Sequence, residues 1–205
     1  CRFSNAKLLF NLDDAHYLYR FNHVMFSYNQ NVNYQIGVNL TTFKNSNFYY
    51  NDEGLQGYGD NDNLYVDSCS FVNNIVGCNG GHIKNSIFTK NSNYAVYMYE
   101  TLDNSEVWDN NIGVIADCHA NTSVLNNYIH DNKIGVQIDR FWNDPRIVFR
   151  YNRICHNIDL NIDYKYLNSA DLRQNCFCLN NLEKIKSSIK DAYDDLSLGV
   201  ITVDT

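Results

Sequence analysis

The chain has 205 residues, a net charge of −7 and seven cysteines. Asn, Tyr, Phe and Ile are frequent and proline occurs once, a mixture that favours short β-strands joined by tight corners. The acidic balance argues against nucleic-acid binding, which needs clustered Lys and Arg. No apolar run reaches the length of about 20 residues that spans a bilayer.

A repeat of three columns runs through the chain from residue 21 to residue 180. Eight rows align on an Asn, with one apolar residue three positions earlier and another eight positions earlier. Successive rows are 17 to 25 residues apart, a period that indicates a solenoid. The Asn column is Asn29, Asn51, Asn74, Asn91, Asn110, Asn132, Asn157 and Asn180; the nearer apolar column is Phe26, Phe48, Phe71, Phe88, Val107, Ile129, Ile154 and Phe177; the farther one is Phe21, Phe43, Val66, Ile83, Leu102, Val124, Phe149 and Leu172.

A second short segment follows each Asn of the repeat and alternates apolar and polar residues. This alternation predicts a strand with one buried face. The aligned Asn side chains are expected to stack as a hydrogen-bonded ladder, because Asn also tolerates the backbone of a tight corner. The segments are 38–41, 55–58, 76–79, 96–99, 114–117, 136–139 and 160–163.

The rows "N-x-[apolar]-x-x-N" followed by "G-[apolar]-x-[apolar]" resemble the right-handed parallel β-helix proteins of the pectin-lyase-like class. The resemblance covers about residues 20 to 180. It implies an all-β, single-stranded, right-handed parallel β-helix solenoid of about eight rungs. The class includes polysaccharide lyases, hydrolases, epimerases, tailspikes and adhesins, so the resemblance indicates a fold and leaves the function open.

The end of the chain differs from the repeat. Apolar residues at spacings of three and four predict an amphipathic helix that starts after Asn180 or Asn181, with Gly199 closing the following turn. "VITVDT" predicts a last strand. Residues 1–180 are therefore expected to form the solenoid and residues 181–205 a C-terminal cap. The run Asn175-Cys-Phe-Cys178, with Asp194-Asp195 and Leu198-Gly199-Val200, resembles the closing segment of adhesin-like β-helix proteins from bacterial and archaeal surfaces.

The fourth position of the alternating segments suggests a site. There Asp117, Asp139 and Asp163 would stack on consecutive rungs, where like charges either face water, bind a cation or raise a pKa. Similarity to pectate-lyase-like enzymes implies that such acids hold Ca²⁺ against a uronate, so Asp117 and Asp139 are candidate metal ligands. His119 and Arg140 complete the catalytic candidates, and His130 is an alternative general acid or base. Acidic residues at strand ends equally serve solubility.

The binding candidates are aromatic and basic. Trp142 would stack on a sugar ring, Arg146 would pair with a carboxylate, and Tyr97 and Tyr99 would present an outward aromatic surface. Asn39 and Asn121 begin Asn-x-Ser/Thr acceptor sequons for glycosylation.

The sequence thus favours a non-catalytic structural or adhesin-like module. We expect it at an extracellular, cell or virion surface, binding polysaccharide or glycoprotein, without an obligatory cofactor, and open to assembly into a larger surface complex. The alternative is a polysaccharide lyase, epimerase or glycoside hydrolase that acts on an acidic polysaccharide, with Ca²⁺ as its cation.

Overall fold

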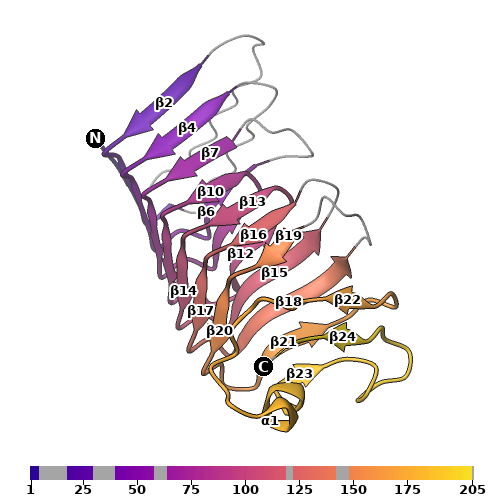
Figure 1. Cartoon of the computed structure of the whole chain (residues 1–205). Helices are drawn as coiled ribbons and strands as arrows, with labels where there is room; N and C mark the ends of the chain where they lie inside the picture. Colours follow the sequence, from indigo (N-terminus) through magenta and orange to yellow (C-terminus); the bar gives the residue numbers. More distant parts are fainter. Residues whose placement is uncertain (5–17, 30–39, 58–63, 119–121, 142–147, 205) are drawn as a thin grey trace.

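The computed structural model describes residues 1–4, 18–29, 40–57, 64–118, 122–141 and 148–204. They form an all-β parallel solenoid of about six turns, with three parallel sheets and one short helix (Figure 1). Each complete turn contributes one strand to every sheet, in the order second, first, third. Within these ranges no helix has the length and apolar character needed to cross a membrane.

The strands of each sheet lie side by side in parallel register, one turn after another. The first sheet contains β1 (Arg2–Ser4), β3 (Met25–Ser27), β5 (Asn47–Tyr49), β8 (Ser70–Val72), β11 (Ile87–Thr89), β14 (Glu106–Trp108), β17 (Tyr128–His130) and β20 (Arg153–Cys155). The second contains β2 (Tyr19–Asn22), β4 (Thr41–Lys44), β7 (Leu64–Asp67), β10 (His82–Lys84), β13 (Thr101–Asp103), β16 (Ser123–Leu125) and β19 (Val148–Arg150). The third contains β6 (Glu53–Gln56), β9 (Val76–Asn79), β12 (Tyr94–Met98), β15 (Ile112–Cys118), β18 (Ile134–Phe141), β21 (Leu160–Tyr164) and β23 (Ile189–Lys190).

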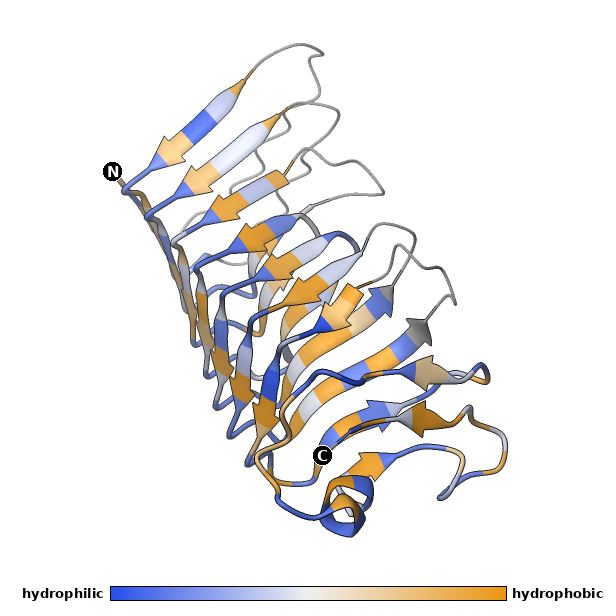
Figure 2. Ribbon diagram, viewed as in Figure 1, coloured by the Kyte–Doolittle hydropathy of each residue, from blue (hydrophilic) through white to orange (hydrophobic). Residues whose placement is uncertain are grey.

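The two apolar columns of the repeat form the core, as predicted. Every residue of the nearer column is at most 2 % exposed, and the farther column is equally buried except for half-buried Phe21. Phe48, Phe71 and Phe88 stack face to face with ring centroids 4.6 Å apart, close to the spacing of adjacent strands. Figure 2 shows apolar bands that recur at the same place on successive strands.

The predicted Asn ladder is present at the corner between the first and third sheets. Each side-chain amide donates to the carboxamide oxygen of the next Asn at 2.9–3.1 Å, from Asn29 through to Asn157. The same oxygen accepts the backbone N–H of the preceding Asn, for example that of Asn91 on Asn110 at 2.9 Å. The ladder therefore satisfies buried polar groups that the corner would otherwise leave unpaired.

A second ladder lies at the corner between the second and first sheets and was not predicted. Here Ser and Asn side chains accept the backbone N–H of the previous turn: Ser86 accepts from Cys69 at 3.2 Å, and Asn127 accepts from Ser105 at 2.9 Å. The residue before each ladder position has a left-handed backbone at both corners, such as Asn85 (φ 52°) and Lys90 (φ 58°). Each turn therefore bends twice through a residue that leaves the extended conformation.

Two rows of the predicted repeat are wrong in part. Asn180 is exposed and lies outside the ladder, because the chain turns away at Cys178, whose φ is 56°. The Asn ladder ends instead where Asn157 donates to Asn161 at 2.9 Å. In the first row Leu40 is 41 % exposed, and Thr41 begins a strand of the second sheet. Residues 38, 39 and 58 lie outside the described ranges.

The C-terminal segment forms a helix, but a shorter one than predicted. Helix α1 (Leu182–Ser187) begins after Asn181, whose side chain accepts the N–H of Glu183 at 2.8 Å, and it buries Ile185. The spacing of three and four also puts Ile189, four residues after Ile185, on the apolar face of the predicted helix, but Ile189 lies in β23, which pairs with β21 in the third sheet. The predicted last strand is β24 (Ile201–Thr202), which pairs with β22 (Ala170–Asp171).

Candidate functional site

The structure describes only part of the predicted site on the outer face of the third sheet. Asp117, Asp139, Asp163, Tyr97 and Tyr99 are described. The backbone of Arg140 lies in β18, but its side chain is outside the description. His119, Trp142 and Arg146, together with the sequons at Asn39 and Asn121, lie outside the described residues.

The predicted line of three carboxylates does not form. Asp163 lies opposite Gln137 rather than Asp139, and Asp117 lies opposite Arg140 across a register irregularity that begins after Ala116. An alternating pattern leaves the register free to shift by two residues without exposing the buried face, which explains the position of Asp163. The irregularity after Ala116 offsets Asp117 from Asp139 by one residue. Asp163 is instead 3.5 Å from the ammonium of Lys165.

Tyr97, Tyr99 and Asp117 do come together. The Tyr97 hydroxyl donates to Asp117 Oδ2 at 3.3 Å, and the rings of Tyr97 and Tyr99 are 5.0 Å apart. Burial, with the neighbouring Tyr99 and Asp117, raises the pKa of Tyr97, so its hydroxyl stays protonated at neutral pH. Asp139 accepts a hydrogen bond from Gln137 at 2.7 Å. In the described part of the chain, no three His, Cys, Asp or Glu side chains are grouped so as to hold a metal ion.

A groove of about 320 Å³ lies on the outer face of the second sheet and crosses four turns. One wall is the outward column Tyr65, His82, Thr101 and Ser123, which lie opposite one another in register. Tyr65 and His82 stack at 4.9 Å, and His82 Nδ1 lies 3.0 Å from the Thr101 hydroxyl. These contacts hold the wall side chains in fixed positions along the solenoid axis.

The opposite wall of the groove alternates in charge. It consists of Asp67, Lys84, Asp103 and Leu125, again in register. Asp67 lies between Lys44 at 3.6 Å and Lys84 at 3.8 Å. Burial alone would raise the pKa of Asp67, but hydrogen bonds from Asn85 and Ser68 and the two ammonium groups lower it overall, so the carboxylate is ionised. The groove therefore offers donors and acceptors on both sides.

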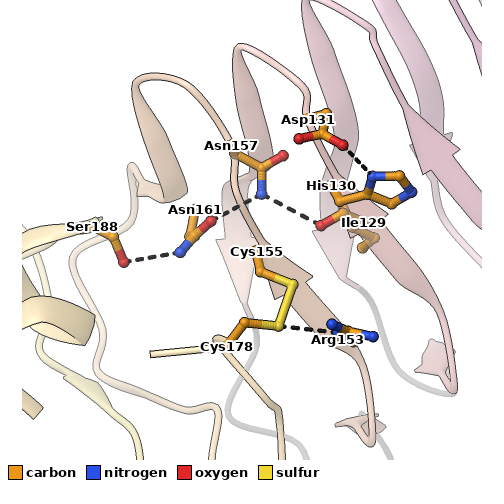
Figure 3. Close-up of a disulfide and its surroundings, with 9 residues drawn as sticks. All are labelled: Ile129, His130, Asp131, Arg153, Cys155, Asn157, Asn161, Cys178 and Ser188. Carbon is orange, nitrogen blue, oxygen red and sulfur yellow. Dashed lines mark hydrogen bonds and ion pairs between the residues drawn. A yellow bond between two sulfur atoms is a disulfide. The ribbon is translucent and has the colours of Figure 1, made fainter. Parts of the chain in front are cut away.

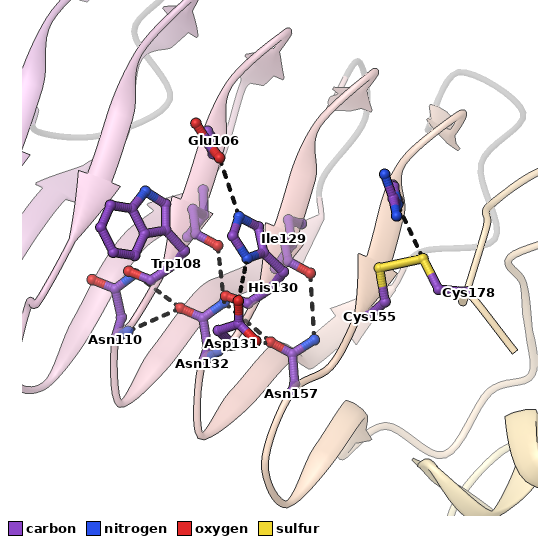
Figure 4. Close-up of polar contacts among 12 residues, drawn as sticks. Glu106, Trp108, Asn110, Ile129, His130, Asp131, Asn132, Cys155, Asn157 and Cys178 are labelled. Carbon is purple, nitrogen blue, oxygen red and sulfur yellow. Dashed lines mark hydrogen bonds and ion pairs between the residues drawn. A yellow bond between two sulfur atoms is a disulfide. The ribbon is translucent and has the colours of Figure 1, made fainter.

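The outer face of the first sheet carries a stack of rings that was not predicted. His130 stacks on Tyr128 at 3.8 Å and lies nearly parallel to Trp108 at 6.3 Å. Its nitrogens meet two carboxylates, Nδ1 at 2.7 Å from Asp131 and Nε2 at 3.2 Å from Glu106 (Figure 4). His130, the alternative general acid or base of the sequence, thus makes two polar contacts, one of them with its neighbour Asp131 at the corner.

Arg153 extends this stack to the next turn. Its guanidinium lies 4.7 Å above the centre of the Tyr128 ring. Its Nε donates to Cys178 Sγ at 3.1 Å, as Figure 3 shows. Cys178 forms a disulfide with Cys155, which joins β20, the last strand of the first sheet, to the turn that follows it. Of the cysteines that the structure describes, Cys1 and Cys176 are exposed free thiols and Cys69 and Cys78 are buried.

The stack could have been found from the repeat. The positions on either side of the nearer apolar column must point outward, because a strand alternates its faces. On three consecutive rows these flanking positions are Glu106 and Trp108, Tyr128 and His130, and Arg153 and Cys155. The acids, however, are concentrated on the strands after the Asn, which is where the sequence predicts a site.

No family model, curated protein or solved structure matches this chain.

Proposed function

We propose that the protein is a non-catalytic recognition module of an extracellular, cell or virion surface. Its ligand is a polysaccharide chain that lies along the groove of the second sheet. We also infer that the solenoid is right-handed and pectin-lyase-like, because crossovers between parallel strands are right-handed in nearly all proteins. If the incomplete turns at the two ends are counted as rungs, we infer eight rungs, one for each strand of the first sheet.

The groove is the observation that carries this proposal. It crosses four turns, and at about 4.8 Å per turn its walls repeat over roughly 14 Å, the length of a short oligosaccharide. The ring of Tyr65, which is 40 % exposed, supplies an apolar contact. Sugar hydroxyls can form hydrogen bonds with the hydroxyls of Thr101 and Ser123. They can also bind the ammonium of Lys84 and the carboxylate of Asp103. Such a mixture of a few oriented polar groups with apolar surface is typical of ligand sites.

Two further features support a surface location and assembly. A disulfide persists in oxidising compartments, so Cys155–Cys178 favours an exported protein. The last turn exposes several apolar side chains, including Leu167 (68 %), Tyr193 (72 %) and Leu196 (95 %), which suits contact with another part of a surface complex.

The test is a glycan-array screen followed by affinity measurements on each hit. The groove variant is Ser123→Tyr, which places a ring between the walls; the control is Ser70→Tyr, also at a half-buried outward strand position but on the first sheet. We expect Ser123→Tyr to weaken binding by about tenfold or more, equivalent to about 1.4 kcal/mol, and Ser70→Tyr to leave it unchanged. Equal affinities for the two variants, or no binding by the wild type, would refute the proposal.

The same hits should be assayed for products with and without Ca²⁺. We expect no products from the wild type and unchanged binding by Asp139→Ala. Products that disappear in Asp139→Ala would instead establish the alternative, a polysaccharide lyase, epimerase or hydrolase that uses the third sheet.

A further inference from the structure

Arg153 is held in place although it is exposed. It points outward from β20, with its guanidinium over the Tyr128 ring at 4.7 Å and its Nε–H donated to Cys178 Sγ at 3.1 Å. These contacts occupy one face of the guanidinium and one of its five N–H groups. The remaining N–H groups belong to the two terminal nitrogens, which form the fork that recognises pairs of oxygen atoms.

The groups beneath Arg153 are themselves fixed. Tyr128 stacks on His130 at 3.8 Å, and His130 is held from both sides by Glu106 and Asp131 (Figure 4). The sulfur that accepts from Arg153 belongs to a disulfide between two turns (Figure 3). Most exposed arginines lose rotamer freedom when they bind, but here much of that entropy is already lost in the folded protein, so less is lost on binding.

Arg153 also has no counter-ion among the residues that the structure describes. Across the described ranges no carboxylate forms an ion pair with it, and the two acids of the ring stack face His130 instead. Arg173 shows the contrasting arrangement: its Nε and one terminal nitrogen donate to the two oxygens of Asp171, at 2.9 and 2.6 Å. Because Nε–H of Arg153 is already donated to Cys178, its two-point contact with an oxyanion from outside the chain would use the two terminal nitrogens instead.

We infer that Arg153 is a recognition site for an anionic group, a carboxylate, sulfate ester or phosphate, carried by a ligand that contacts the outer face of the first sheet. The site is independent of the groove, because it lies on another sheet. The net charge of −7 repels polyanions at long range, so binding rests on the local two-point contact rather than on a basic field.

The first experiment compares three polymers with one backbone: dextran, carboxymethyl dextran and dextran sulfate, with a phosphate-substituted dextran as a fourth arm. The wild type should bind at least one charged polymer about tenfold more tightly than dextran. Arg153→Gln should remove that difference, and Arg153→Lys should remove most of it, because an ammonium cannot form the planar fork. The control is Lys90→Gln, an exposed corner residue with the same loss of charge, which should keep the difference.

A second measurement does not depend on a variant. In the wild type, the Nε–H resonance of Arg153 should shift on titration with sodium acetate, sulfate or phosphate, and not with sodium chloride at equal ionic strength. The inference would be overturned if the wild type bound all four polymers equally. It would also be overturned if Lys90→Gln reduced the preference for charged polymers as much as Arg153→Gln does, or if the resonance did not shift. Ser123→Tyr should leave both readouts unchanged, so a failed groove proposal and a failed anion site are distinguishable.

Discussion

Replacing Asn91 by Ala tests how much the Asn ladder stabilises the solenoid. The Asn91 side chain donates to Asn110 Oδ1 at 2.9 Å and to the Phe71 carbonyl at 3.2 Å, and it accepts the backbone N–H and the amide of Asn74, both at 3.1 Å. At about 1 kcal/mol of net stability for each hydrogen bond, the loss of these four bonds lowers the free energy of unfolding by about 4 kcal/mol. That is a large share of the 5–15 kcal/mol typical of a domain.

Ser86→Ala is the matched control. Ser86 is as buried as Asn91, at 1 % exposure, and lies five residues earlier, but its side chain makes two hydrogen bonds: it accepts from Cys69 at 3.2 Å and donates to the Lys84 carbonyl at 2.8 Å. Ser86→Ala should lower the free energy of unfolding by about 2 kcal/mol, half the decrease expected for Asn91→Ala. Urea unfolding followed by circular dichroism measures both. Equal losses, or a loss below about 1 kcal/mol for Asn91→Ala, would refute this account of the ladder.

The remaining predictions concern the core, an ionisable ring and the covalent link. Phe71→Ala removes a fully buried ring that is stacked at 4.6 Å on both faces, so it should lower the free energy of unfolding in urea by about 3–5 kcal/mol. A decrease as small as that of a surface mutation would contradict this description of the core. Burial and neighbouring Glu53 raise the pKa of Tyr94 to about 12. Because this folded-state pKa exceeds the unfolded value of about 10, the contribution of Tyr94 to stability is complete below pH 10 and is lost between about pH 10 and 12. Ultraviolet titration should show the delayed ionisation, and Tyr94→Phe should reduce its amplitude by one tyrosine, leaving that of Tyr97, whose pKa is also raised. Replacing Cys155 and Cys178 by Ser should lower stability by about 2–4 kcal/mol, and alkylation mapped by mass spectrometry should label Cys176 but neither bridged cysteine in the native protein.

The repeat was predictable because each turn must present the same groups to its neighbours. A parallel solenoid brings equivalent positions together, so Phe71 meets Phe88 and Asn91 meets Asn110 wherever the chain repeats the columns. The second ladder was not predicted because its positions do not repeat one residue type but hold Ser, Cys or Asn. What these side chains share is that they accept a backbone N–H.

The candidate sites were harder to predict, for two physical reasons. The register of an alternating strand is ambiguous by two residues, so the acids at Asp117, Asp139 and Asp163 seemed to align when Asp163 pairs with Gln137. Outward side chains also interact across turns in ways that spacing does not show. The repeat places Arg153 opposite Tyr128 on the next turn, but it does not show that the guanidinium lies over the ring, because that contact depends on rotamers.

The link between Cys155 and Cys178 has a mechanical consequence. In a solenoid each turn contacts mainly its two neighbours, so a chain pulled by its ends unwinds turn by turn from a terminus rather than all at once. Pulling from the C-terminus first releases the 27 residues after Cys178, about 90 Å of extended chain. Force then reaches a covalent bond that transfers it directly to the preceding turn. Single-molecule extension should therefore pause at that length under oxidising conditions and continue without a pause once the bond is reduced.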